Sequence, residues 1–246
     1  MTSACFDVVE PIEAAEPTLI EGLPGHGLVA SIAVDQVTDQ LALTHTGNVT
    51  ADAFPPVVTF DDGLVRNLVR VYGGTDPSVL TLKSDIALPQ PAFEPLADCV
   101  LTDLAGTFGK GIFIAGAPAE SEEQIGDVTG VATTPALRAE LEAAGVTVAK
   151  DQGLVGGITG TLVRECHRRE VPAQLLIVRA HPFLPDPRAA QAVIEEALEP
   201  LVEFEIDTTP LAERAEEIKA RMQQVAAQYR QMAEEGQPQQ QTGMFQ

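Results

Sequence analysis

The stretch TLIEGLPGHGLVASIAVDQVTDQL, residues Thr18 to Leu41, decides the fold class. A short apolar run ends at the glycine-rich loop Gly22–Gly27, and apolar residues then recur at helical spacing up to Leu41. The stretch therefore predicts a buried strand, a glycine loop and a helix.

The same alternation of strand and helix continues along the chain. Short runs rich in branched residues predict strands at Val57–Phe60, Leu64–Tyr72, Val79–Leu82, Gly111–Ala115 and Leu175–Val178. Helical patterns between them predict helices at Phe93–Phe108, Pro135–Ala143, Gly157–Arg169 and Pro187–Val202.

The turn sequence Asp61-Asp62-Gly63 predicts a β-hairpin between the first two of these strands. Strands that alternate with helices indicate an α/β fold with a parallel sheet, and a hairpin adds antiparallel strands. We therefore expect residues 1–210 to form one α/β domain with a mixed, mostly parallel sheet.

The last part of the chain has a different pattern. Residues 211–235 predict a long amphipathic helix, and residues 236–246 are rich in Gln and Gly and predict a flexible tail. The helix carries a heptad stripe that we expect to pack against another helix of the same or a neighbouring protomer. The stripe consists of Leu211, Ala215, Ile218, Met222, Val225, Tyr229 and Met232.

Charge excludes some classes of partner. The chain has 246 residues and a formal net charge of −21, so neither nucleic acid nor an anionic membrane surface is an expected partner. Arginine outnumbers lysine, and we interpret the acidic excess as that of a protein from a halophilic source. No apolar segment is long enough to span a membrane, and the N-terminal residues do not have the pattern of a signal peptide. We expect a cytoplasmic protein.

Cysteine and histidine give no sign of a metal centre. Cys5, Cys99 and Cys166 are far apart, and the four histidines show no paired ligand spacing. Cys166 and His167 are adjacent on a predicted helix, which is poor geometry for a nucleophile and its base. We therefore expect no metal, no cofactor and no catalytic residue.

Two glycine loops remain as candidate sites. Each opens a helix and could bind an anion, but neither has the spacing of a dinucleotide or phosphate-binding loop. The alternative is that they serve backbone geometry alone, with Gly25 at positive φ. The first loop contains Gly22, Pro24, Gly25, His26 and Gly27, and the second contains Gly153, Gly156, Gly157 and Gly160.

Three elements together resemble the archaeal and bacterial proteasome assembly chaperone family. They are LIEGLPGHGLV at residues 19–29, GLVGGITG at 153–160 and HPFLPDPRAA at 181–190, within a resemblance that covers residues 17–211. It implies a three-layer α/β/α sandwich similar to nucleoside phosphorylases, homo-oligomers with a trimer favoured, and a non-enzymatic role as chaperone or adaptor. The chain departs from the usual family pattern at His26, where other members have an apolar residue.

The resemblance also implies a partner, the proteasome α subunits. Met244-Phe245-Gln246 resembles the hydrophobic-tyrosine-any ending with which proteasome activators enter pockets between α subunits, with Phe245 in place of the tyrosine. The competing hypothesis is a small-molecule protein, either an enzyme or a binder of nucleotide or phosphate, that uses the Gly22–Gly27 loop.

Overall fold

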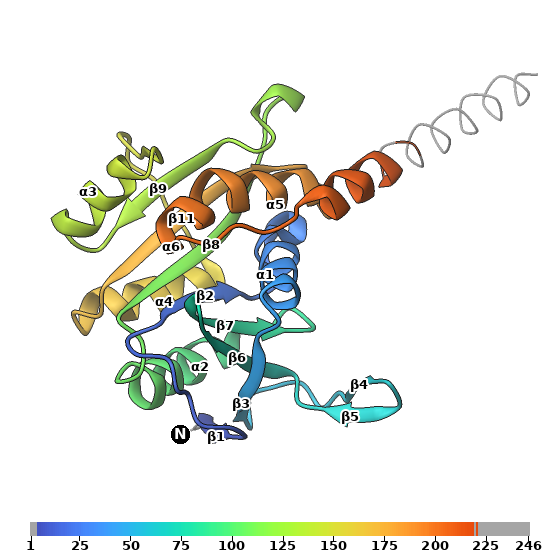
Figure 1. Cartoon of the computed structure of the whole chain (residues 1–246), viewed down its shortest axis with the longest axis vertical. Helices are drawn as coiled ribbons and strands as arrows, with labels where there is room; N and C mark the ends of the chain where they lie inside the picture. Colours follow the sequence, from blue (N-terminus) through green and yellow to red (C-terminus); the bar gives the residue numbers. More distant parts are fainter. Residues whose placement is uncertain (1–3, 219, 221–246) are drawn as a thin grey trace, which may run out of the picture.

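The chain folds into three layers around a nine-stranded sheet (Figure 1). This computed structural model describes residues 4–218 and 220. The strands of the large sheet are β1 (Ala4–Val8), β2 (Thr18–Gly22), β3 (Thr44–Ala51), β6 (Val69–Thr75), β7 (Ser78–Ser84), β8 (Lys110–Pro118), β9 (Val128–Ala132), β10 (Thr147–Val148) and β11 (Ala173–Ala180). A separate two-stranded sheet consists of β4 (Thr59–Asp61) and β5 (Leu64–Arg66).

The helices follow the predicted ranges closely. They are η1 (His26–Leu28), α1 (Val29–Gln40), η2 (Gln90–Ala92), α2 (Phe93–Cys99), η3 (Val100–Leu104), η4 (Glu122–Gln124), α3 (Pro135–Ala143), α4 (Gly157–Arg168), α5 (Pro187–Val193), η5 (Ile194–Leu198) and α6 (Glu199–Val202). Residues 209–218 are also helical. No helix in the described part of the chain combines the length and the apolar character that a membrane crossing needs.

The large sheet is mixed, as predicted. Its order is β1-β3-β6-β7-β2-β8-β11-β9-β10, and the four central strands β7, β2, β8 and β11 run parallel. The strands β6 and β9 join this centre in the antiparallel direction. The fold is therefore the expected α/β/α sandwich, although the predicted hairpin lies outside its sheet.

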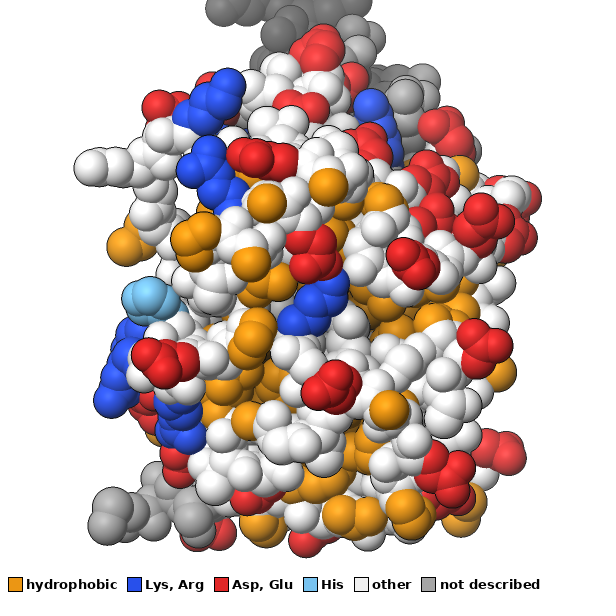
Figure 2. All heavy atoms as spheres, turned by 60° about the vertical axis from the view of Figure 1, so that its left-hand side comes forward, with side chains coloured by type: hydrophobic (Ala, Val, Ile, Leu, Met, Phe, Trp, Pro, Cys, Tyr) orange, Lys and Arg blue, Asp and Glu red, His pale blue; other side chains and the backbone are white. Residues whose placement is uncertain are grey.

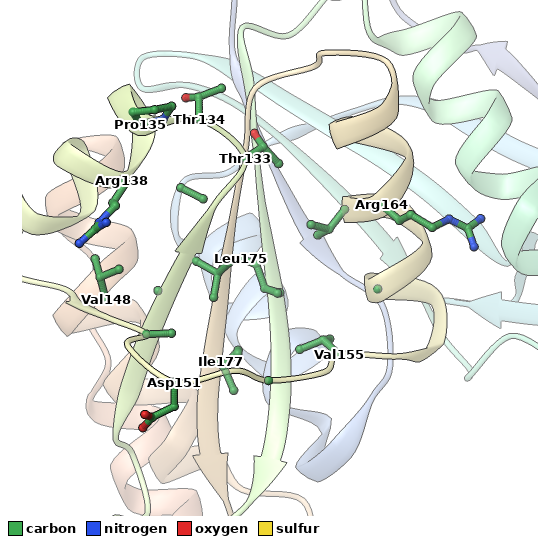
Figure 3. Close-up of a pocket in the computed structure, with 17 residues that line it drawn as sticks. Thr133, Thr134, Pro135, Arg138, Val148, Asp151, Val155, Arg164, Leu175 and Ile177 are labelled. Carbon is green, nitrogen blue, oxygen red and sulfur yellow. The ribbon is translucent and has the colours of Figure 1, made fainter.

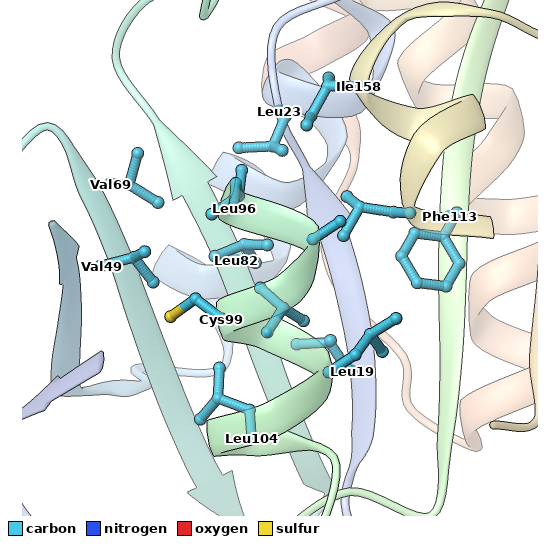
Figure 4. Close-up of a cluster of buried hydrophobic side chains, with 14 of the residues drawn as sticks. Leu19, Leu23, Val49, Val69, Leu82, Leu96, Cys99, Leu104, Phe113 and Ile158 are labelled. Carbon is cyan, nitrogen blue, oxygen red and sulfur yellow. The ribbon is translucent and has the colours of Figure 1, made fainter. Parts of the chain in front are cut away.

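Two hydrophobic clusters hold the layers together. Strand β2 alternates between them, because Leu19 faces the cluster that α2 and α4 cover while Ile20 faces the cluster under α1 and α5. Figure 4 shows the first cluster, where Leu82, Leu96 and Phe113 pack between helix and sheet. The central strands are therefore buried on both faces.

Four strands were not predicted, and one predicted strand is divided. Strands β1, β3, β9 and β10 lack a long apolar run; β3 reads THTGNVTA. The predicted strand Leu64–Tyr72 is broken at Asn67 and Leu68 into β5 and β6. The break lets the β4–β5 hairpin leave the plane of the large sheet, and it separates the predicted hairpin from the core.

Candidate functional site

The three sequence elements of the resemblance meet at one edge of the sheet. Strands β2, β8 and β11 run parallel, so the segments that follow them lie at the same edge. The backbone N–H of Asp186 donates to the carbonyl of Gly27 over 2.8 Å, which joins the third element to the first. The second element faces the first across a cavity. We call this region the carboxyl edge.

The cavity at the carboxyl edge has a volume of about 620 Å³. Both glycine loops line it, together with the ends of strands β8 and β11. Apolar side chains such as Phe93, Ile114 and Ile177 supply most of its wall, and Thr159 is among the polar groups. The cavity lies where small ligands bind in open α/β sheets, but its wall offers few polar groups to fix one.

Two glycines of the first loop serve close packing and an unusual backbone conformation. A Cβ at Gly22 would lie 2.4 Å from the Cβ of Val34, so glycine allows α1 to cross β2 closely. Gly27 has φ of +63°, which side chains disfavour. The expectation for Gly25 is wrong: its φ is −139°, and nothing lies within 4 Å of a Cβ built there.

The other loop residues lie close to these two. Pro24 and His26 line the cavity, and the buried Nε2 of His26 has no hydrogen-bond partner among the described residues. In the second loop Gly157 begins α4, and a Cβ at Gly160 would lie 2.3 Å from the carbonyl oxygen of Val155. Gly153 and Gly156 also line the cavity.

Sequence reasoning missed Glu21, which is fully buried at the end of β2. The backbone N–H groups of Leu23 and Ile114 donate to its carboxyl group over 3.1 and 3.3 Å, and the Thr159 hydroxyl lies 3.3 Å from both of its oxygens. Burial raises the pKa of Glu21 to about 8, although these hydrogen bonds act in the opposite direction. The signal in the sequence is an acid directly after the apolar run Leu19-Ile20.

Glu21 therefore holds three elements together rather than facing a reactant. Its partners belong to the loop after β2, to β8 and to α4, and the residue itself is not part of the cavity wall. The Thr159 hydroxyl donates to this carboxyl group, which joins α4 to the end of β2. Among the described residues, no group of three or more His, Cys, Asp or Glu side chains is placed to hold a metal ion.

A second hollow lies on the face of the sheet that α4 partly covers. It has a volume of about 700 Å³, and apolar residues of β9 and β11, such as Leu175 and Ile177, line it (Figure 3). Arg138 and Arg164 lie on opposite sides, and each is paired with a glutamate of its own helix, Glu142 and Glu165. Figure 2 shows hydrophobic side chains gathered on this side of the molecule. This hollow therefore offers mainly apolar contact.

The heptad stripe begins on the body of the protein. Leu211 is buried in the cluster under α1 and α5. Ala215 and Ile218 are partly buried and line a hollow together with Leu184 and Pro185. The stripe residues Met222, Val225, Tyr229 and Met232 and the tail residues Met244, Phe245 and Gln246 lie outside the described residues.

Comparison with known proteins places this chain in a family. The PAC2 family matches residues 19–226, so the chain belongs to the PAC2 family. Uncharacterized protein MJ0106 of Methanocaldococcus jannaschii is 29% identical over 222 residues, which cover 90% of each chain.

Solved structures have the same fold. Pyrococcus furiosus PbaA, an archaeal homolog of proteasome-assembly chaperone, is 26% identical, with a TM-score of 0.82 over 94% of this chain and 95% of that chain. Pyrococcus furiosus PbaB, an archaeal proteasome activator, is 22% identical, with a TM-score of 0.81 over 92% of this chain and 100% of that chain. At that identity, the likeness to PbaB shows the fold alone.

Proposed function

We propose that this PAC2 family chain is a non-enzymatic proteasome assembly chaperone or adaptor that binds the α subunits of the core particle. The observation that carries the proposal is the similarity to PbaA, which extends over 94% of the chain at 26% identity. The carboxyl edge is consistent with this role, because its fully buried carboxyl group joins structural elements and does not line the cavity.

We propose further that the C-terminal residues make the contact with the α subunits. By the resemblance, Phe245 enters a pocket between adjacent α subunits, Met244 fills an apolar shelf, and the carboxylate of Gln246 pairs with a lysine. Phenylalanine lacks the tyrosine hydroxyl, so a single tail forms one hydrogen bond fewer. Self-association compensates, because several tails on one oligomer raise the effective concentration of the motif.

The described part of the chain supports a fixed starting point for that tail. The helical residues 209–218 leave the body in Figure 1, and Leu211 fixes their first turn because only 2% of its surface is exposed. Contact through Ala215 and Ile218 extends this attachment.

Deletion of Met244–Gln246 tests the proposal. We expect the truncated protein to keep its melting temperature and oligomer mass and to lose binding to assembled α subunits, measured by pull-down in molar KCl. Phe245→Ala should reproduce the loss, whereas Phe245→Tyr should bind at least as tightly as the natural sequence.

A substitution of Gln240 by alanine is the matched control, because it changes the same polar segment without touching the motif. Undiminished binding by the truncated protein would exclude the tail mechanism. Failure of the full-length protein to bind α subunits at all would exclude the proposed function.

A further inference from the structure

The β4–β5 hairpin projects from the body (Figure 1). The hairpin and the two residues before β4 together carry five exposed apolar side chains. An isolated two-stranded hairpin is at best marginally stable in water, and clustered exposed apolar residues mark interaction surfaces. The hairpin therefore needs a partner to pack against. The five residues are Val57, Val58, Phe60, Leu64 and Val65, with exposed fractions of 53%, 63%, 70%, 74% and 73%.

The two faces of the hairpin differ in charge. Phe60 is paired directly with Val65, so the two side chains share one face, which we call the Phe60 face. The opposite face carries the ion pair between Asp61 and Arg66 at 2.8 Å, and it also carries Leu64. Within the described residues, neither side chain of the Phe60 face is covered. The uncharged, exposed face is therefore the one that needs a partner.

The charge of the chain indicates what that partner is. Each chain has 36 acidic and 15 basic side chains, so two copies repel each other over most of their surfaces. The two side chains of the Phe60 face, Phe60 and Val65, carry no charge, so contact between two copies through these side chains does not pair carboxylate with carboxylate. An uncharged apolar face suits a partner that is itself strongly acidic, and a second copy of this chain meets that condition.

We propose that the Phe60 face packs against the same face of a second copy in a two-fold contact. A two-fold axis places the large Phe60 of one copy against the small Val65 of the other, and the reverse contact follows by symmetry. The proposal rests on the self-association that is part of the proposed function, and it names the surface. A two-fold contact gives an even number of copies, whereas the resemblance favours a trimer.

Serine substitutions on the two faces test the contact. The measurement is made in molar KCl, where charge repulsion is screened. The double variant Phe60→Ser/Val65→Ser should weaken self-association by roughly a hundredfold or more, because a two-fold contact buries each of these side chains once in each copy. Leu64→Ser is the control, since it removes an equally exposed residue from the opposite face. Sedimentation velocity over a concentration series measures both, and circular dichroism should show that both variants remain folded.

Cysteine cross-linking gives a second readout. In a Cys5→Ser background, which leaves the buried Cys99 and Cys166, a mixture of the Phe60→Cys and Val65→Cys proteins should form a covalent dimer with oxidised glutathione, because the contact places these two positions together. A mixture of the Phe60→Cys and Leu64→Cys proteins should not form one. Equal cross-linking in the two mixtures, or an unchanged mass of the double serine variant, would overturn the proposal.

The outcome for α subunits separates this proposal from the proposed function. A double serine variant that dissociates and binds α subunits more weakly, through a single tail per molecule, supports both. One that keeps its mass and loses α-subunit binding shows that the Phe60 face contacts the proteasome, which overturns the second-copy contact alone. A trimer whose mass is unaffected by substitutions on the Phe60 face overturns the second-copy contact as well.

Discussion

Leu82 in β7 and Leu64 in β5 are the same residue in two strands, yet Leu82 is fully buried and Leu64 is 74% exposed. Strand β7 lies between β6 and β2, and helices cover both faces of the sheet around it. Strand β5 has a single neighbour, β4. An apolar strand pattern therefore predicts that a face will be buried, but it does not say which molecule buries it.

An ion pair at the base of the hairpin fixes the strands from which the hairpin projects. Arg70 in β6 has a buried side chain and donates to both carboxylate oxygens of Asp85 over 2.7 Å. Burial alone would raise the pKa of Asp85, but the bonds to Arg70 hold it below its usual value. This pair fixes the end of β7 to β6 beside the break at Asn67, so the hairpin begins at a rigid support.

The largest expected effect compares the two leucines directly. Leu82→Ala removes a fully buried side chain and should lower the free energy of unfolding by about 2–5 kcal/mol. Leu64→Ala should change it by no more than about 0.5 kcal/mol, because that side chain is exposed. Urea unfolding of both variants measures the difference, and equal effects would break the comparison.

The second prediction concerns how stability depends on pH through the buried carboxyl group of Glu21. The carboxyl group of Glu21 ionises near its ordinary value of 4.5 in the unfolded chain and has a pKa of about 8 in the folded chain. The folded state therefore binds more protons between these values, and the free energy of unfolding falls as pH rises from 4.5 through 8.

Glu21→Gln removes this ionisation. Relative to the natural sequence, the free energy of unfolding of the variant should rise by about 4 kcal/mol as pH rises over that range. Thermal unfolding of both proteins in matched salt at several pH values measures the gain. Parallel curves for the two proteins would show that the carboxyl group is not held protonated by burial.

The smallest of the three effects distinguishes two glycines of one loop. Gly22→Ala places a methyl group 2.4 Å from the Cβ of Val34, so α1 must move from β2 at a cost of about 1–3 kcal/mol. Gly25→Ala should be tolerated, since its φ is −139° and the space around it is open. A Gly25→Ala protein less stable than Gly22→Ala would contradict this assignment of roles.

Periodicity and turn residues predicted much of the fold. Pro135 and Ala143 are the predicted and the observed ends of α3, and the Asp62-Gly63 turn has positive φ at both residues, as a tight hairpin needs. Strand β3 escaped prediction because its buried residues include Thr46 and Asn48, whose polar side chains carry no apolar pattern. Such a strand is specified by its neighbours β1 and β6.

The candidate site was predicted only in part. The glycine loops do lie together along one cavity. The first follows β2, and the second opens α4, whose Thr159 reaches Glu21 at the end of that strand. Glu21 was missed, since its role depends on Ile114 and Thr159, which are distant in sequence. Gly25 was assigned the conformation that Gly27 has, because spacing alone does not distinguish glycines that lie two residues apart.

The sequence by itself determined the local features of this protein: the strand, loop and helix of Thr18–Leu41, the hairpin turn, the helix ends and the acidic charge. These follow from neighbouring residues, whose spacing and backbone preferences act over a few positions. Only the tertiary structure decided that Glu21 is sealed in the core and that the Phe60 face is left outside it. Burial depends on what packs from distant parts of the chain, and that is decided by the order of strands in the sheet and the helices above it.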